Sequence, residues 1–268
     1  MAFLWIWLTG LLLILAVLTC LWLISIRLRN VSIVDIFWGG GFVLLGLWYH
    51  VKTPAAGGWK TVVLGLVVLW GLRLTFYLAW RNRGRGEDPR YREFRKKYGE
   101  TRYWWISYFQ TFLLQGVLMW FISAPLLAAQ VGGFSARPGV FDFIGVALWT
   151  IGMVFETGGD LQLLRFKSRP GNRGKVLQSG FWRYTRHPNY FGDACVWWGF
   201  GFMALAGGKA WPLLGSLTMT VLLLRVSGVT LLERSLERSK PEYREYMERT
   251  SAFFPWFPKK TIRRSSNP

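Results

Sequence analysis

Long apolar stretches alternate with short polar segments along the chain, a pattern that predicts a polytopic all-α membrane protein. We expect seven membrane-spanning helices, at residues 3–25, 33–50, 61–80, 105–128, 140–158, 191–208 and 211–231. A helix needs about 20 apolar residues to cross the hydrocarbon core of a bilayer, and most of these stretches reach that length. Turn-forming clusters such as residues 53–58 separate them. We therefore expect a single membrane domain over residues 1–268.

The composition excludes an ordinary soluble domain. Of the 268 residues, 52% are hydrophobic and 17 are Trp, a residue that is enriched at membrane–water interfaces. The two cysteines, Cys20 and Cys195, both fall in apolar stretches, so we expect neither a disulfide framework nor a metal site.

The distribution of the +19 net charge predicts an orientation in the membrane. Basic residues concentrate in four segments, residues 26–32, 81–103, 159–190 and the tail after 231, which hold 2, 9, 7 and 9 of the 33. The opposite side holds only Lys52, Lys60, Arg137 and Lys209. Cytoplasmic loops of membrane proteins are enriched in Lys and Arg. We therefore expect the amino terminus outside and the carboxyl terminus in the cytoplasm.

Six charged residues lie inside expected spans; Asp142 is at the outer edge of its span, and the other five fall toward the cytoplasmic leaflet. These five are Asp35, Arg73, Glu156, Asp193 and Arg225. Charges at such depth are costly, and they usually face a bundle interior or a water-filled cavity. The two arginines can instead extend to the headgroup region. The convergence of all five on one leaflet favours a shared polar cavity.

The two long basic segments indicate a site for an anionic ligand. Residues 81–90 and 165–175 combine arginines, which bind phosphate through paired hydrogen bonds, with glycines that leave the backbone accessible. The alternative is a basic patch that binds anionic lipid, at about 1 kcal/mol per cation. Asp160, Asn189 and Tyr190 suit ribose hydroxyls and a carboxamide but not lipid. These residues favour a nucleotide cofactor bound from the cytoplasm, and we expect no binding of nucleic acid.

No soluble nucleotide-binding motif accompanies these residues. The sequence has no GxGxxG after a strand and no GxxxxGK phosphate loop. The run Trp38-Gly39-Gly40-Gly41 lies in an apolar helix and predicts close helix packing. The membrane helices themselves must therefore form the cofactor pocket.

The segment Gly180-Phe181-Trp182-Arg183-Tyr184-Thr185-Arg186-His187-Pro188-Asn189-Tyr190-Phe191-Gly192-Asp193 resembles the carboxyl-terminal half of the steroid 5α-reductase family. Asp160, Arg165 and Lys167 upstream of it, and Asn82-Arg83-Gly84-Arg85, match the same family. The pattern is closest to the bacterial branch, with residues 34–39 near the start and 243–246 near the end. The resemblance covers residues 30–258, and the part from 156 to 258 would carry most of the cofactor site.

This resemblance implies a seven-helix fold and NADPH-dependent reduction of the C4–C5 double bond of a 3-oxo-Δ4-steroid or a similar enone lipid. The residues at or near the family's cofactor-binding positions are Asn82, Arg85, Asp160, Lys167, Lys175, Tyr184, Asn189 and Arg225. Glu156 stands where relatives have an asparagine. The expected cofactor site also includes Arg165, Arg173, His187 and Asp193, which lie in the same segments.

The resemblance also places the expected catalytic residues on the second and third spans. Asp35 aligns with a family glutamate that contacts the steroid ketone. The family's tyrosine on the third span has no match, because Gly71 stands near it, with Trp70 and Arg73 beside it. Tyr77, a polar residue on the same span near the presumed pocket, is a further expected catalytic residue together with Arg73. A buried, neutral Asp35 could stabilise the enolate oxygen through a hydrogen bond. Alternatively, Asp35 caps its helix, as Asn30 and Ser32 can.

Two other functions remain open on the sequence alone. The pattern Arg-His-Pro-x-Tyr-x-Gly occurs in looser form in membrane methyltransferases that use S-adenosylmethionine, although that cofactor would leave many cations unexplained. A non-catalytic sterol-binding protein would leave Asp35, Asp160 and Asn189 without a task. Glu233 either closes the pocket or pairs with Arg234. We expect a monomer in the bilayer of a bacterial inner membrane, with an apolar substrate that enters from the lipid.

Overall fold

The computed structural model describes residues 2–53, 58–131, 138–226 and 228–259, and every regular element within them is helical. The all-α prediction is therefore confirmed for this part of the chain. The chain divides into two compact units, Met1–Phe143 with Phe200–Gly215 and Ile144–Gly199 with Ser216–Pro268. A single membrane domain over the whole chain stays a prediction.

Five helical stretches are long and apolar enough to cross a membrane. They are α1 (Ala2–Leu28), α2 (Ile33–Lys52), α3 (Gly58–Asn82), the stretch Glu100–Val131 and α8 (Val140–Ser168). They match the first five expected spans. The last two expected spans correspond to α9 (Pro188–Ala206) and to α10 (Leu213–Val221) with the π-helix η4 (Leu222–Val226). Neither is among the five candidates, so the count of seven and the orientation stay predictions.

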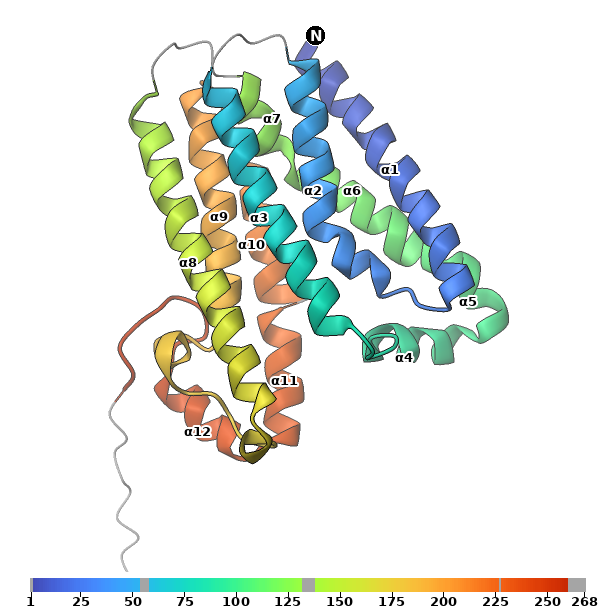
Figure 1. The fold of residues 1–268 in the computed structure, drawn as a ribbon, viewed down its shortest axis with the longest axis vertical. Coiled ribbons are helices and arrows are strands. Elements are labelled where there is room, and N and C mark those ends of the chain that lie inside the picture. The colour runs from blue at the N-terminus through green and yellow to red at the C-terminus, as the bar shows by residue number, and fades with distance from the viewer. Residues whose placement is uncertain (1, 54–57, 132–137, 227, 260–268) are drawn as a thin grey trace, which may run out of the picture. The chain divides into compact units, whose positions relative to one another are not determined.

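In the first unit, α2 packs against both α1 and α3 (Figure 1). The contact with α3 is made by glycines. A Cβ atom added to Gly39 would meet the carbonyl oxygen of Gly71, and one added to Gly71 would meet that of Gly39. Small residues let membrane helices approach to backbone contact. The close packing predicted from residues 38–41 is confirmed.

The fourth apolar stretch is not one regular helix. It comprises α5 (Glu100–Ser107), the π-helix η1 (Tyr108–Leu113), α6 (Leu114–Ile122) and α7 (Ala124–Val131). Ser123 separates α6 from α7, because Pro125 follows it and cannot continue the backbone hydrogen bonds of α6. A short helix, α4 (Pro89–Tyr98), precedes the stretch, where the sequence indicated only a basic loop.

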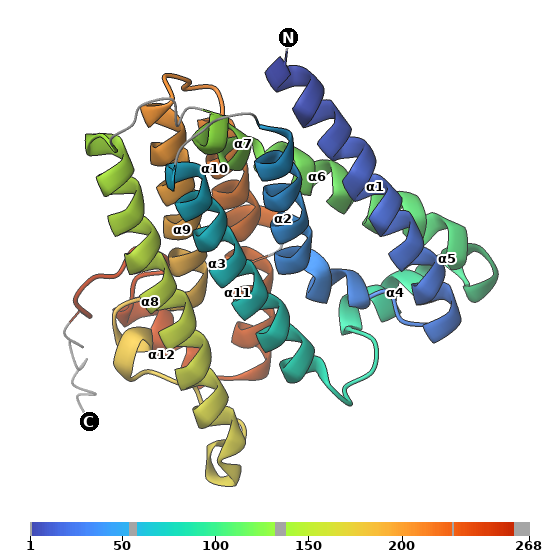
Figure 2. The ribbon, with the colours of Figure 1, turned by 45° about the horizontal axis from the view of Figure 1, so that its top comes forward.

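In the second unit, α8 and α9 also meet through glycines. A Cβ atom on Gly192 would lie 2.5 Å from the carbonyl oxygen of Gly152, and one on Gly199 would lie 2.7 Å from that of Gly145. Helix α8 runs without interruption to Ser168 (Figure 2). Asp160, Arg165 and Lys167 therefore lie on a helix and not, as expected, in a loop.

Short helical turns and two amphipathic helices complete the second unit. After α8 come the 3-10 turns η2 (Pro170–Asn172) and η3 (Gly180–Arg183), and after η4 come α11 (Val229–Ser239) and α12 (Glu242–Arg249).

Candidate functional site

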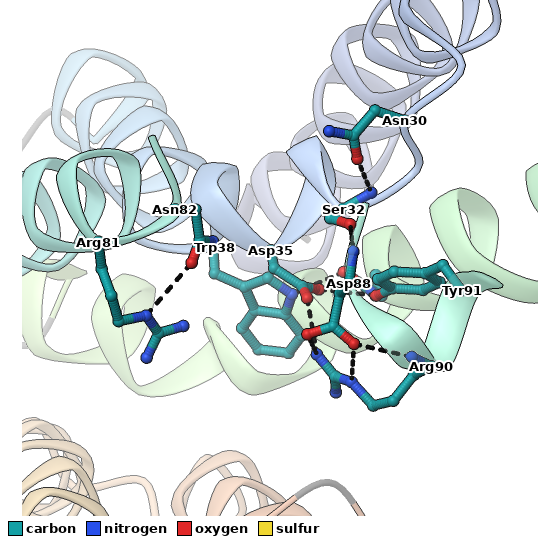
Figure 3. Close-up of polar contacts among 10 residues, drawn as sticks. Asn30, Ser32, Asp35, Trp38, Arg81, Asn82, Asp88, Arg90 and Tyr91 are labelled. Atoms are coloured by element: carbon teal, nitrogen blue, oxygen red, sulfur yellow. Dashed lines mark hydrogen bonds and ion pairs between the residues drawn. The ribbon is translucent and has the colours of Figure 1, made fainter. Parts of the chain in front are cut away.

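A polar cluster surrounds Asp35 in the first turn of α2 (Figure 3). The hydroxyl of Tyr91 donates a hydrogen bond of 2.7 Å to Asp35 Oδ1, and a terminal nitrogen of Arg90 lies 2.8 Å from Asp35 Oδ2. The amide nitrogen of Gln115 donates to the Tyr91 oxygen at 3.2 Å. The indole N–H of Trp38 donates to the amide oxygen of Gln115 at 2.6 Å. We refer to these five residues as the Asp35 cluster.

The start of α4 holds Arg90 and Tyr91 against Asp35. Asp88 is the N-cap of α4, and its carboxylate accepts from the backbone N–H of Arg90 at 2.9 Å. Pro89 follows at the first helical position, where its fixed backbone angle favours helix formation. The backbone N–H of Asp88 donates to the hydroxyl oxygen of Ser32 at 2.6 Å. The cap is thereby tied to the residue just before α2.

A second tie joins the same two segments. The carboxylate of Glu87 accepts from the backbone N–H of Val31 at 2.8 Å. The same carboxylate receives two hydrogen bonds from the guanidinium of Arg95, at 2.9 and 3.0 Å. Paired hydrogen bonds of this kind fix geometry as well as charge. The position of α4 beside the start of α2 is therefore set by two separate contacts.

The electrostatics of α4 keep Tyr91 protonated. Burial raises the pKa of the Tyr91 hydroxyl, and the nearby charge of Asp35 raises that pKa further. Burial acts to raise the pKa of Asp88, but hydrogen bonds from Arg90 outweigh it and leave that pKa lowered. Asp88 is therefore an anion and Tyr91 a neutral hydrogen-bond donor over the physiological pH range.

The structure separates the alternatives for Asp35. Its carboxylate faces Arg90 and Tyr91 on α4, and the N-cap residue of α2, Ser32, makes no side-chain capping bond. Asp35 therefore joins two helices and does not cap its own.

Arg73 and Tyr77, the other expected catalytic residues, lie on α3. The guanidinium of Arg81 lies 5.6 Å from the ring centroid of Tyr77.

Sequence reasoning missed Tyr91, Gln115 and Arg90. Tyr91 is only 6% exposed, whereas the sequence around it is strongly basic and indicated a loop that binds an anionic ligand. The available signal was Asp88-Pro89, which is a typical helix start and implies that the next turn has a buried face.

A second cluster lies where α8 meets α9, in the other unit. Glu156 and Asp160 are 3% and 4% exposed, and their spacing of four residues puts them on one face of α8. The side-chain amide of Asn189 donates to Asp160 Oδ1 at 3.2 Å. Asn189 lies in the first turn of α9, the helix end that favours a negative charge. Asp193 follows one turn later. We refer to these four residues as the Asp160 cluster.

The residues just before Asn189 are held by the carboxyl-terminal helices. Arg186 Nε donates to Glu233 Oε1 at 2.7 Å, and His187 Nε2 lies 3.0 Å from the same oxygen. Arg186 also donates to the backbone carbonyl of Met247 at 2.9 Å. Arg186 and His187 are only 7% and 1% exposed. Their contacts hold the segment just before α9 against α11 and α12. We call the contact among Arg186, His187 and Glu233 the Arg186 clamp.

The expected cationic residues of this unit are on its surface. Arg165, Lys167, Arg173, Lys175 and Arg225 are all exposed. Tyr184 is 37% exposed and packs edge-to-face against Phe257, with the ring centroids 5.9 Å apart. The second unit thus combines two buried acids, Glu156 and Asp160, and the amide of Asn189 with exposed lysine and arginine side chains. This set of groups fits a ligand with phosphates and neutral hydrogen-bonding groups.

Asn82 and Arg85 lie at the end of α3 and just after it, in the first unit. The amide oxygen of Asn82 accepts from Arg81 Nε at 3.3 Å (Figure 3). Arg85 is exposed between Gly84 and Gly86, which both have positive φ angles, of 74° and 70°. Glycine adopts this conformation without strain, and the sharp turn presents Arg85 to solvent.

Comparison with known proteins gives a family and distant enzyme relatives. DUF1295, a family described as proteins of unknown function, matches residues 21–250. An uncharacterised protein of Schizosaccharomyces pombe is 26% identical over 263 residues, which cover 88% of this chain and 75% of that protein. No solved structure gives a significant match.

Two steroid enzymes match over shorter stretches. 3-Oxo-5-alpha-steroid 4-dehydrogenase 1 of Rattus norvegicus is 34% identical over 106 residues, which are 39% of this chain and 35% of the enzyme. The enzyme of the same name from Mus musculus is 40% identical over 72 residues, 26% of each chain. The chain thus matches only about a third of the rat enzyme and a quarter of the mouse enzyme.

Proposed function

This chain belongs to DUF1295, a family related to the steroid 5α-reductases, and we propose that it is a membrane-embedded, NADPH-dependent reductase. The proposed substrate is a 3-oxo-Δ4-steroid or another apolar enone, reduced at the double bond conjugated to its ketone. The five apolar helical stretches and the similarity to two 3-oxo-5-alpha-steroid 4-dehydrogenases support this proposal.

The observation that carries the proposal is the hydrogen bond from Tyr91 to Asp35. Reduction of an enone adds a hydride to the β-carbon and a proton to the α-carbon, and negative charge develops on the carbonyl oxygen in between. A fixed donor at that oxygen lowers the barrier. We propose that the Tyr91 hydroxyl is this donor. Tyr91 would then take the role of the steroid 5α-reductase tyrosine that has no match on the third span of this chain.

The contacts of Asp35 suggest a role different from that of a neutral acid. Donors engage both of its oxygens, Oδ1 through the Tyr91 hydroxyl at 2.7 Å and Oδ2 through Arg90 at 2.8 Å. We propose that Asp35 accepts these hydrogen bonds and orients Tyr91. Arg73 and Tyr77 remain alternative donors on α3.

The cofactor would supply the hydride. We propose that the phosphate groups bind to the exposed cations Arg165, Lys167, Arg173 and Lys175, and that Asp160 and Asn189 bind neutral groups of the cofactor. Charge-assisted hydrogen bonds from arginine suit phosphate. Asn82, Arg85, Glu156, Tyr184, Asp193 and Arg225 are further proposed contacts. His187 would act through the Arg186 clamp, because its side chain is buried against Glu233.

The remaining proposals concern the membrane. We propose that the protein is a monomer that spans the bilayer seven times, and that the cofactor site opens to the cytoplasm of a bacterial cell. The substrate would enter from the lipid. The excess of basic residues on one set of segments supports this orientation.

The experiment is a reductase assay on the purified protein in lipid nanodiscs. NADPH oxidation is followed with a panel of Δ4-3-ketosteroids and other enones, and products are identified by mass spectrometry. We expect the saturated ketone, with NADPH preferred over NADH. Failure of every enone, together with thermal stabilisation by S-adenosylmethionine and not by NADPH, would replace the reductase with a methyltransferase.

A further inference from the structure

The indole of Trp38 fixes the direction of the hydrogen bonds in the Asp35 cluster. Trp38 Nε1 lies 2.6 Å from one end of the Gln115 amide. An indole N–H can only donate, so the amide must present its oxygen to Trp38. The orientation of the Gln115 amide therefore follows from the chemistry of its neighbour.

The same reasoning extends to the next two residues. With its oxygen facing Trp38, Gln115 presents its NH2 group to Tyr91, whose oxygen lies 3.2 Å away. An amide NH2 group can only donate, so the Tyr91 oxygen accepts there. Its own hydrogen then points to Asp35 Oδ1, 2.7 Å away. The chain of donors runs one way, from Trp38 through Gln115 and Tyr91 to Asp35.

This chain ends on a group that only accepts. Asp35 Oδ1 receives the Tyr91 hydroxyl, and Asp35 Oδ2 receives Arg90 at 2.8 Å. In this arrangement both carboxyl oxygens act as acceptors. The transferable hydrogen in the cluster is the one on Tyr91.

We propose that Gln115, held in one orientation by Trp38, is a positioning residue that makes Tyr91 the hydrogen-bond donor of the reductase reaction. This inference rests on the proposed function. In the reaction the substrate carbonyl replaces Asp35 Oδ1 as the acceptor of the single Tyr91 hydrogen. Negative charge then grows on the Tyr91 oxygen, and the NH2 group of Gln115 is already placed against it. An interaction that strengthens in the transition state raises kcat more than it changes KM.

Two substitutions test the direction of the hydrogen bonds in the Asp35 cluster. Gln115→Glu keeps the shape of the side chain, but its carboxylate accepts from both Trp38 and Tyr91 and draws the Tyr91 hydrogen away from the substrate. We expect kcat to fall by about 100-fold, the lower end for loss of a donor at a developing charge, with KM nearly unchanged. Trp38→Phe frees the amide to turn over, and kcat should fall by about 10-fold, as for loss of one hydrogen bond.

A matched control separates this effect from loss of an indole. Trp48 also lies on α2, and its indole N–H donates to Thr9 at 3.2 Å, outside the Asp35 cluster. Trp48→Phe should leave kcat and KM unchanged. If Gln115→Glu keeps wild-type kcat, or if both Trp variants lower kcat equally, the positioning role is wrong.

A stability measurement tests the same inference without activity. Thermal unfolding of Gln115→Met, Tyr91→Phe and the double variant gives the coupling between positions 115 and 91. We expect clear coupling in the wild-type background and its loss when Trp38→Phe is added. Coupling that persists without the indole would overturn the inference. If Trp38→Phe abolishes the coupling but the wild-type protein reduces no enone, the reductase function is wrong. The one-way order of hydrogen bonds from Trp38 to Asp35 would still hold.

Discussion

The guanidinium of Arg186, two residues before α9, lies 2.7 Å from the carboxylate of Glu233 on α11. The side chains are 8% and 14% exposed, so this ion pair is largely shielded from water. Burial acts to raise the pKa of Glu233, but hydrogen bonds from His187 and Arg186 outweigh it and hold that pKa below its usual value. The Arg186 clamp therefore requires an ionised Glu233.

The first prediction concerns stability at different pH values. A carboxyl group whose pKa is lowered by folding stabilises the protein above its unfolded pKa, about 4.3 for glutamate, and loses this effect as the pH falls through its folded pKa. We expect Glu233→Gln to lower the free energy of unfolding by about 1–3 kcal/mol at neutral pH. In thermal unfolding, the difference from wild type should shrink below about pH 4. A difference that is constant with pH would contradict this role.

The second prediction concerns the proposed donor. Tyr91→Phe keeps the ring but removes the hydroxyl, so we expect kcat for enone reduction to fall by about 100- to 1,000-fold, as when an oxyanion donor is removed. The thermal shift produced by NADPH should persist, because Tyr91 is not among the proposed cofactor contacts. Steady-state kinetics with saturating NADPH give the comparison. A larger loss of kcat in Tyr77→Phe than in Tyr91→Phe would move the donor to α3.

The third prediction distinguishes Asp35 as an acceptor from Asp35 as an acid. Asp35→Asn retains an acceptor oxygen for Tyr91 but loses the charge that pairs with Arg90. We expect kcat to fall by about 10-fold, as for one hydrogen bond to a charged group. A loss of activity as large as that of Tyr91→Phe would indicate instead that Asp35 itself donates the hydrogen bond.

The fourth prediction concerns the phosphate contacts. Arg173→Gln and Lys175→Gln remove exposed charges after α8. We expect each to raise the KM for NADPH by about 10-fold, the effect of one charge-assisted hydrogen bond, and to affect NADH less because NADH lacks the 2′-phosphate. Lys209→Gln is the control, since Lys209 lies 4.1 Å from the ring of Phe3 in the other unit. Equal effects on both cofactors would exclude a 2′-phosphate contact at these positions.

The fifth prediction concerns the contact between α2 and α3. A methyl group at position 39 would press on the backbone of Gly71, so Gly39→Ala should lower the free energy of unfolding by about 1–3 kcal/mol. Gly65 on the same pair of helices has no heavy atom within 4 Å of an added Cβ. Gly65→Ala should be neutral or stabilising by about 1 kcal/mol. Equal effects of the two substitutions in thermal unfolding would contradict a glycine contact.

The sequence by itself predicted which segments are apolar helices and which of their positions are small enough for close packing. Runs of apolar residues gave the first five spans, because the hydrocarbon thickness sets their length. The glycines at 39–41 predicted close packing. Asp160 and Asn189 were both assigned to the cofactor site, and in the structure Asn189 Nδ2 lies 3.2 Å from Asp160 Oδ1.

Only the tertiary structure decided which side chains meet across helices. Tyr91 reaches Asp35 over 56 residues of chain, and Arg186 turns to Glu233 over 47. Neither pair has a local sequence signal, because a contact between helices depends on their rotation and on how closely glycines such as Gly39 and Gly71 let them approach. The composition of a helix indicates whether it lies in lipid or water. It does not determine how the helix is rotated, and this rotation decides which side chains meet on a neighbouring helix.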